Sequence, residues 1–68
     1  MTRQNVSSSN LRSVGYDNST LEIEFNSGSI YQYSGVPANI HTALMAASSH
    51  GTYFNANIKN IYRFRQVR

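Results

Sequence analysis

Residues 21–25 constrain the fold more than any other part of the chain. Leu21, Ile23 and Phe25 alternate with Glu22 and Glu24, and this alternation is typical of a β-strand with one buried face. Turn-forming residues lie on both sides of the strand, at positions 17–20 and 26–28. Apolar positions typical of strands continue beyond both turns, in residues 11–16 and 29–33. The pattern therefore predicts an antiparallel meander of three strands.

The turn at residues 26–28 decides which face of the sheet carries Tyr31 and Tyr33. A two-residue turn would place both rings on the acidic face, whereas a three-residue turn places them on the apolar face. We favour the three-residue form because only Gly28 must then adopt a left-handed backbone. The three-residue turn pairs Ile23 with Tyr31 and Leu21 with Tyr33, and the turn at residues 17–20 pairs Tyr16 with Leu21 and Val14 with Ile23. This register makes the rings part of the core, while the alternative is a platform on which bases stack.

A helix with one apolar face is predicted for residues 37–49. Pro37 suits the first helical position because its missing N–H is no loss there. The residues at i, i+3, i+4 and i+7 of the following segment are Ile40, Ala43, Leu44 and Ala47. Gly51 is a natural stop, since glycine readily takes the left-handed conformation that ends helices. We expect this helix to lie on the apolar face of the meander through Ile40 and Leu44.

The ends of the chain complete the expected fold. Residues 1–8 are polar and predict a flexible arm ahead of a single domain at residues 9–68. Residues 52–61 fit either a short second helix or a loop, because asparagine is a poor helix former. Residues 62–67 alternate again and predict a fourth strand, with Tyr62 and Phe64 on one side and Arg63 and Arg65 on the other. The sequence thus predicts an α+β fold in which a three-stranded antiparallel meander packs against one helix.

Composition argues against an enzyme. The chain has 68 residues and no cysteine, so neither a disulfide nor a thiolate metal site is possible. His41 is expected at the surface of the helix, and His50 is expected to satisfy free carbonyl groups at its end. Glu22 and Glu24 share a strand face, but acids opposite an apolar face are ordinarily solvated. We therefore expect no catalytic residues, no metal, no cofactor and no small-molecule substrate.

The apolar stretches are only a few residues long, so we expect neither a membrane span nor an apolar signal core. The absence of cysteine fits a reducing compartment. We therefore expect a cytoplasmic protein.

Charge is distributed unevenly along the chain. The net charge is +3, all three acids fall at positions 17–24, and the last ten residues carry four cations and no acid. A basic segment of this kind is typical of a polyanion binder, although a solvated tail has the same composition. The residues expected to contact a nucleic acid are Lys59, Arg63, Arg65, Arg68, Tyr31, Tyr33, Tyr53 and Tyr62. Arg12 joins them if the last strand pairs with the first.

An ordered series of residues resembles the KTSC domain family, which is named for its occurrence at the C-terminus of some lysyl-tRNA synthetases. The central feature is Tyr31-Gln32-Tyr33, which matches the Tyr-x-Tyr hallmark of that family. The other matching positions are Val6, Ser8 to Leu11, Val14 to Asp17, Leu21, Phe25, Ser27-Gly28, Val36-Pro37, Leu44, Ala47, Ser49, Gly51 and Tyr53 to Asn55. The resemblance implies no catalytic residues, and its synthetase context implies RNA, including tRNA, as a partner.

Two functions follow from these observations. The first is a small non-catalytic module that binds RNA or tRNA through the basic C-terminal strand. The second is a protein-interaction or homo-oligomerisation module, in which the exposed edge of that strand pairs with another chain. In the second case, the basic end would meet the acidic face at Glu22 and Glu24 of a neighbouring copy.

Overall fold

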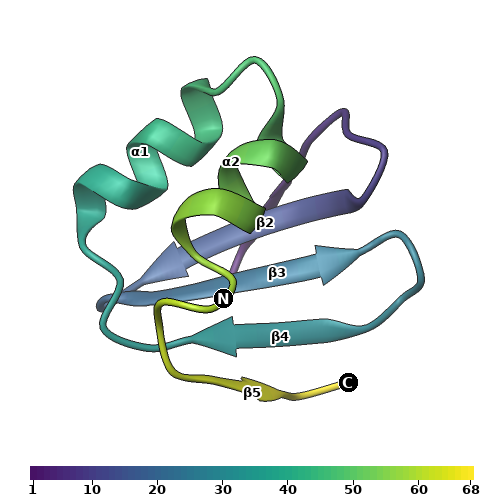
Figure 1. Ribbon diagram of the computed structural model, residues 1–68. Coiled ribbons are helices and arrows are strands. Elements are labelled where there is room, and N and C mark those ends of the chain that lie inside the picture. Colours follow the sequence, from purple (N-terminus) through teal and green to yellow (C-terminus); the bar gives the residue numbers. More distant parts are fainter.

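A five-stranded antiparallel sheet carries two helices on one of its faces (Figure 1). The computed structural model describes residues 1–68. The strands are β1 (Arg3–Asn5), β2 (Leu11–Asp17), β3 (Thr20–Phe25), β4 (Ile30–Tyr33) and β5 (Phe64–Gln66), and they lie side by side in chain order. The helices α1 (Ala38–Ala46) and α2 (His50–Asn57) fall between β4 and β5. Neither helix has the length and apolar character that crossing a membrane requires.

The α+β class and the register of the central strands are confirmed. Ile23 pairs with Tyr31 and Leu21 with Tyr33, as the three-residue turn requires. Gly28 has a φ of 96°, and the Phe25 N–H donates to the Ser29 carbonyl oxygen at 2.9 Å to close the turn. The meander is nevertheless only the middle of the sheet, because one further strand pairs with each of its edges.

The core lies between the sheet and the helices. Its nine buried residues come from β2, β3, β4, α1, α2 and the adjoining loops, and they are Leu11, Val14, Leu21, Ile23, Tyr33, Val36, Leu44, Phe54 and Ile58. Ile40 packs against this cluster as a partly buried residue, so the predicted contact of Ile40 and Leu44 with the sheet is confirmed. Full burial of such side chains stabilises the fold by roughly 1.5–3 kcal/mol each.

The N-terminal segment departs from its prediction as a flexible arm. Arg3–Asn5 form β1 and pair with β2, with Arg3 opposite Gly15 and Asn5 opposite Ser13. The Val6 N–H also donates to the Arg12 carbonyl oxygen at 3.0 Å. Polar residues thus form an edge strand here because their backbone N–H and C=O groups hydrogen-bond to those of β2 that would otherwise be unpaired.

The predicted single helix at residues 37–49 is interrupted. α1 ends at Ala46, and Ala47 is extended with φ −67° and ψ 142°. Ser49 then caps a second helix, because its hydroxyl accepts a hydrogen bond from the Thr52 N–H at 3.3 Å. Gly51 was expected to stop the helix but lies in the first turn of α2, so that expectation is wrong. Of the two alternatives left open for residues 52–61, the helix holds as far as Asn57.

The last strand pairs with β4 and not with β2. Tyr33 lies opposite Phe64, Gln32 opposite Arg65, and Tyr31 opposite Gln66. The condition on which Arg12 would join the predicted site is therefore not met, since β3 and β4 separate β2 from β5. The outer edge of β2 is already occupied by β1, which leaves the edge of β4 for the returning chain.

Candidate nucleic-acid interface

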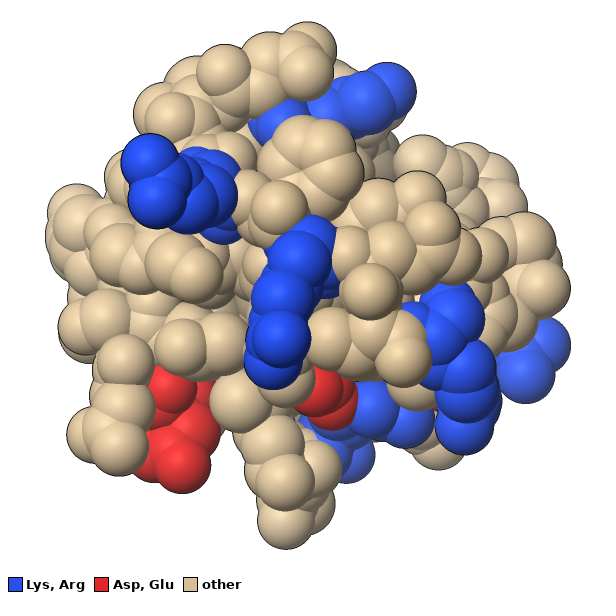
Figure 2. Space-filling model, turned by 90° about the horizontal axis from the view of Figure 1, so that it is seen from below, with Lys and Arg blue, Asp and Glu red and all other residues tan.

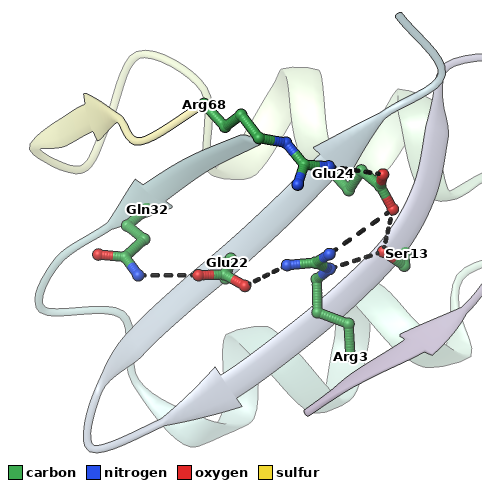
Figure 3. A network of polar contacts seen from close by, with 6 residues as sticks. All are labelled: Arg3, Ser13, Glu22, Glu24, Gln32 and Arg68. Carbon is green, nitrogen blue, oxygen red and sulfur yellow. Dashed lines mark hydrogen bonds and ion pairs between the residues drawn. The ribbon is translucent and has the colours of Figure 1, made fainter. Parts of the chain in front are cut away.

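A row of polar side chains crosses the helix-free face of the sheet (Figure 3). Arg3, Gly15, Glu22, Gln32 and Arg65 are consecutive cross-strand partners, one on each strand. Arg3 Nη1 donates to Glu22 Oε2, and Gln32 Nε2 donates to Glu22 Oε1 at 2.8 Å. Arg65 Nη2 then donates to Gln32 Oε1 at 3.4 Å. The row therefore links the two edge strands through one carboxylate.

The second acid of this face is also engaged within the chain. Ser13 Oγ donates to Glu24 Oε1 at 2.8 Å, and Arg3 Nε donates to Ser13 Oγ at 2.9 Å. Arg68 Nη2 lies 3.7 Å from Glu24 Oε2 as an ion pair. The expected solvated acids are thus a paired network, and Glu22 is only 7% exposed. The pairing within the chain also removes the acidic patch that would have attracted a second copy.

The network changes the acidity of Glu22. Burial on its own would raise the pKa of this carboxyl group. The hydrogen bonds from Gln32 and Arg3, together with the charge of Arg3, outweigh burial and hold the pKa below its ordinary value of 4.5. Glu22 is therefore ionised at neutral pH, and its charge strengthens its contacts with Arg3 and Gln32 across the sheet.

Positive charge remains unpaired after these contacts. Arg3 and Arg68 pair with carboxylates, whereas Arg12, Lys59, Arg63 and Arg65 make no ion pair. Lys59, Arg63 and Arg65 lie on β5 or in the segment leading to it, and all three are exposed. Figure 2 looks at the molecule from below Figure 1 and shows Lys and Arg side chains spread over the side seen there, with a small area of acid beside them and another bordered by other residues.

A pocket of about 560 Å³ opens on the helix side of the sheet, beside β5. Its aromatic walls come from four elements and are Phe25, Tyr31, Tyr33, Phe54 and Phe64. Polar groups complete the lining, namely Ser9, Asn10, Asn26, Ser27, Ser29, Asn55, Asn60 and Lys59. No acid lines the pocket. Its volume falls in the range of roughly 300–1,000 Å³ that small-molecule sites occupy.

The predicted tyrosines separate into two groups. Tyr31 and Tyr33 lie 6.5 Å apart between ring centroids and line the pocket. Tyr33 is only 4% exposed, which excludes a flat platform made of both rings, whereas Tyr31 is half-buried. Tyr53 and Tyr62 pack against the core and do not line the pocket.

Three phenylalanines of the pocket were not among the predicted site residues. Phe64 lies 5.6 Å from Tyr33 and 5.7 Å from Tyr31 between ring centroids. The alternation of residues 62–67 placed Phe64 opposite the arginines, but not beside the tyrosines. That contact depends on β5 pairing with β4, which no local pattern specifies.

The two histidines lie on the helices and do not line the pocket. His41 is half-buried rather than free at the surface, and its ring stacks on Tyr16 at 4.7 Å with an interplanar angle of 6°. Burial lowers the pKa of His41 from its ordinary value of 6.5. His50 Nδ1 lies 2.8 Å from the Leu44 carbonyl oxygen, which confirms its predicted role at the end of α1. No three potential metal ligands gather in the structure.

Comparison with known proteins finds one matching family and similar proteins of about the same length. The family model described as the KTSC domain matches residues 7–62. An uncharacterised protein of Stutzerimonas stutzeri is 43% identical over 70 residues, covering 98% of this chain and 99% of that protein. The crystal structure of a KTSC domain protein from Yersinia pestis has a TM-score of 0.95 and 43% identity, covering 98% of this chain and 97% of the other.

A second type of relative is much longer. The lysine–tRNA ligase of Nostoc punctiforme is 46% identical over 48 residues, which are 71% of this chain and 9% of the ligase. The similarity is therefore to one short segment of that enzyme.

Proposed function

This chain belongs to the KTSC domain family, and on that premise we propose that it is a non-catalytic module that binds RNA through the basic segment around β5. One observation carries the proposal: Lys59, Arg63 and Arg65 are exposed and have no carboxylate partner. The similarity to a segment of lysine–tRNA ligases supports RNA, including tRNA, as the partner class. It also supports a cytoplasmic location as part of the proposal.

The internal pairing of the acids favours a polyanion. Glu22 and Glu24 are held by Arg3 and Arg68, so their charges do not repel a phosphate backbone that approaches β5. Each cation that neutralises a phosphate releases a counterion, and binding then weakens as salt increases. Arg65 is already oriented by Gln32, which reduces the entropy that its side chain loses on binding.

Binding to single-stranded RNA and to tRNA at several salt concentrations tests the proposal. We expect the Arg63→Ala, Arg65→Ala double variant to bind about tenfold more weakly, with a salt slope lower by about 1.4 on single strands, or about 0.7 for each lost contact. Arg12→Ala is the control for each single Arg→Ala variant, because it removes an equal charge two strands away from β4. Affinity that is independent of salt, or an equal loss in Arg12→Ala and Arg63→Ala, would contradict the proposal.

The alternative of strand pairing rests on a different observation. β5 is the last strand of the sheet, so one of its edges has no neighbour, and all three of its residues are exposed. Sedimentation of the protein without RNA tests self-association through this edge. A monomer at high concentration removes that version, whereas a stable dimer that binds no RNA at any salt concentration favours it over the RNA proposal.

A further inference from the structure

The pocket beside β5 presents aromatic surface that the fold itself does not cover. Phe64 is 53% exposed, although it contacts Tyr31 and Tyr33 on the neighbouring strand. Phe54 closes the inner end and meets Tyr33 edge to face, with ring centroids 5.4 Å apart. Aromatic rings thus line both the deep wall and the rim, and a planar ring system can pack against them by stacked or edge contacts.

Tyr33, which lines this pocket, has a hydroxyl group without a partner in the protein. The residue as a whole is 4% exposed. Every fully buried side-chain oxygen or nitrogen in the protein has a hydrogen-bond partner. Since the Tyr33 hydroxyl has none, it must be accessible to solvent. We place it at the pocket, because that is the surface that Tyr33 lines. Burial and the neighbouring Tyr31 raise the pKa of Tyr33 to about 12. The group therefore keeps its proton at neutral pH and is a free donor.

Other polar side chains of the pocket also lack hydrogen-bond partners within the protein. The side-chain amides of Asn10, Asn55 and Asn60 line it and make no hydrogen bond within the protein. Each amide offers both a donor and an acceptor. Lys59 adds a positive charge that no acid neutralises. The lining therefore suits a planar ligand with polar edges and an attached anion.

We propose that this pocket receives the base of an unpaired nucleotide, with Lys59 contacting its phosphate. The inference rests on the proposed RNA function and assigns it a specific subsite. Stacking on aromatic rings binds any of the bases, and the amides and the Tyr33 hydroxyl meet the base edge. A paired base is stacked within its helix and cannot enter, so the pocket selects single-stranded segments and loops.

The position of the pocket relates it to the unpaired cations. Lys59 is on its lining, Arg63 precedes β5, and Phe64 is the first residue of that strand. An RNA strand bound in the pocket would meet Lys59 directly and would reach Arg63 and Arg65 by crossing the exposed edge of β5. Lys59 therefore lies at the base site itself, whereas Arg65, which contacts Gln32, lies on the opposite face of the same edge strand.

Two-dimensional NMR with defined probes tests the inference on the whole protein. Adenosine and uridine 5′-monophosphate should shift the signals of Phe64, Tyr31 and Asn55, whereas ribose 5-phosphate and inorganic phosphate should shift only Lys59 and its neighbours. A single-stranded hexanucleotide should bind at least about fivefold more tightly than a duplex of equal length. Equal binding of both, with pocket signals that do not move, would overturn the inference.

Variants distinguish this inference from the proposed function. Phe64→Ala should weaken binding of the hexanucleotide about tenfold, in keeping with the loss of one stacking ring. Ile61→Ala is the matched control, because Ile61 is also an exposed apolar residue (62%) but does not line the pocket. Phe64→Leu keeps the apolar bulk if the alanine variant folds poorly, and should show the same loss.

Three further outcomes are decisive. If Phe64→Ala binds normally while Arg63→Ala, Arg65→Ala does not, the base site is wrong and the RNA function stands. If no RNA or nucleotide binds the wild-type protein, the proposed function fails and this inference fails with it. If N-acetyl-tyrosine amide shifts the pocket signals and the nucleotides do not, the pocket receives an aromatic side chain of a protein partner, which also overturns the inference.

Discussion

Arg3 reaches Glu22 across an intervening strand because Gly15 lies between them. Gly15 is the cross-strand partner of both residues, and its lack of a side chain leaves the space through which the Arg3 guanidinium passes. A Cβ atom built on Gly15 would lie 2.9 Å from the Thr2 carbonyl oxygen and 3.0 Å from Arg3 Cγ. One glycine thus permits both the close approach of β1 and the ion pair that neutralises Glu22.

We therefore expect Gly15→Ala to destabilise the protein by about 1–3 kcal/mol, because the added methyl group forces β1 away from the sheet. Urea denaturation measures the change, and hydrogen exchange should show lost protection in β1 and β2. In a double-mutant cycle, Arg3→Ala should cost less in the Gly15→Ala background than alone, since the same contacts are already lost.

Gly51→Ala is the control for this prediction. A Cβ at Gly51 would meet its nearest atoms at 3.6 Å, an ordinary contact distance. Because Gly51 lies within α2, alanine there should be neutral or stabilising by up to about 1 kcal/mol. Equal destabilisation by both substitutions would show that the close approach of β1 to Gly15 does not cause the loss of stability.

The Glu22 carboxylate should stabilise the protein at neutral pH and lose this contribution in acid. Its folded-state pKa lies below the ordinary 4.5, so the unfolded chain binds the proton first as the pH falls. The contribution is complete above about pH 4.5 and decreases as the pH falls through the folded-state pKa. Glu22→Gln should therefore be less stable than wild type by about 1–2 kcal/mol at pH 7.

The difference between these two proteins should be constant from pH 7 to about 4.5 and should shrink as the pH falls further, because a protonated Glu22 resembles glutamine. Urea unfolding of both proteins across this range measures it. A difference that stays constant with pH would mean that the charge of Glu22 does not contribute to stability.

His41 should produce a second, separate pH dependence. Burial against Tyr16 favours the neutral ring and lowers the pKa below 6.5. The stabilisation that neutral His41 contributes is fully present above about pH 6.5. It decreases as the pH falls toward the folded-state pKa, because the unfolded chain takes up a proton first. Thermal unfolding between pH 7.5 and 5.5 should show the loss in wild type, and His41→Phe, which retains a ring to stack, should remove it. An unchanged slope in the variant would assign the loss to another group.

Local chemistry explains why the centre of the sheet could be predicted. The register of Tyr31 and Tyr33 follows from one short turn, because only Gly28 needs a positive φ in the three-residue form. The alternation of residues 21–25 specifies a buried face without reference to the rest of the chain. Family resemblance added the identity of the domain, and the match at residues 7–62 agrees with it.

The outer strands could not be predicted because their positions depend on contacts between distant residues. Arg3–Asn5 carry no apolar alternation, and β1 forms because Gly15 leaves room for it. Similarly, β5 joins β4 because the other edge of the meander is taken. The aromatic pocket is a consequence of that pairing, since Phe64 reaches Tyr33 only in this strand order.

Tyr16 and Tyr33 differ in whether the hydroxyl group forms a hydrogen bond within the protein. The Tyr16 hydroxyl donates to the Val36 carbonyl oxygen at 2.6 Å, whereas the Tyr33 hydroxyl has no partner within the protein. Tyr16→Phe should therefore lose about 1 kcal/mol of stability and keep its affinity for a single-stranded hexanucleotide. Tyr33→Phe should keep its stability.

In the same experiment, Tyr33→Phe should bind the hexanucleotide roughly three- to tenfold more weakly, because a hydrogen bond to the base edge is lost while the ring remains. Urea unfolding and fluorescence anisotropy on both variants separate the two effects. Destabilisation of Tyr33→Phe equal to that of Tyr16→Phe would mean that the Tyr33 hydroxyl serves the fold, and unchanged affinity would remove it from the base contact.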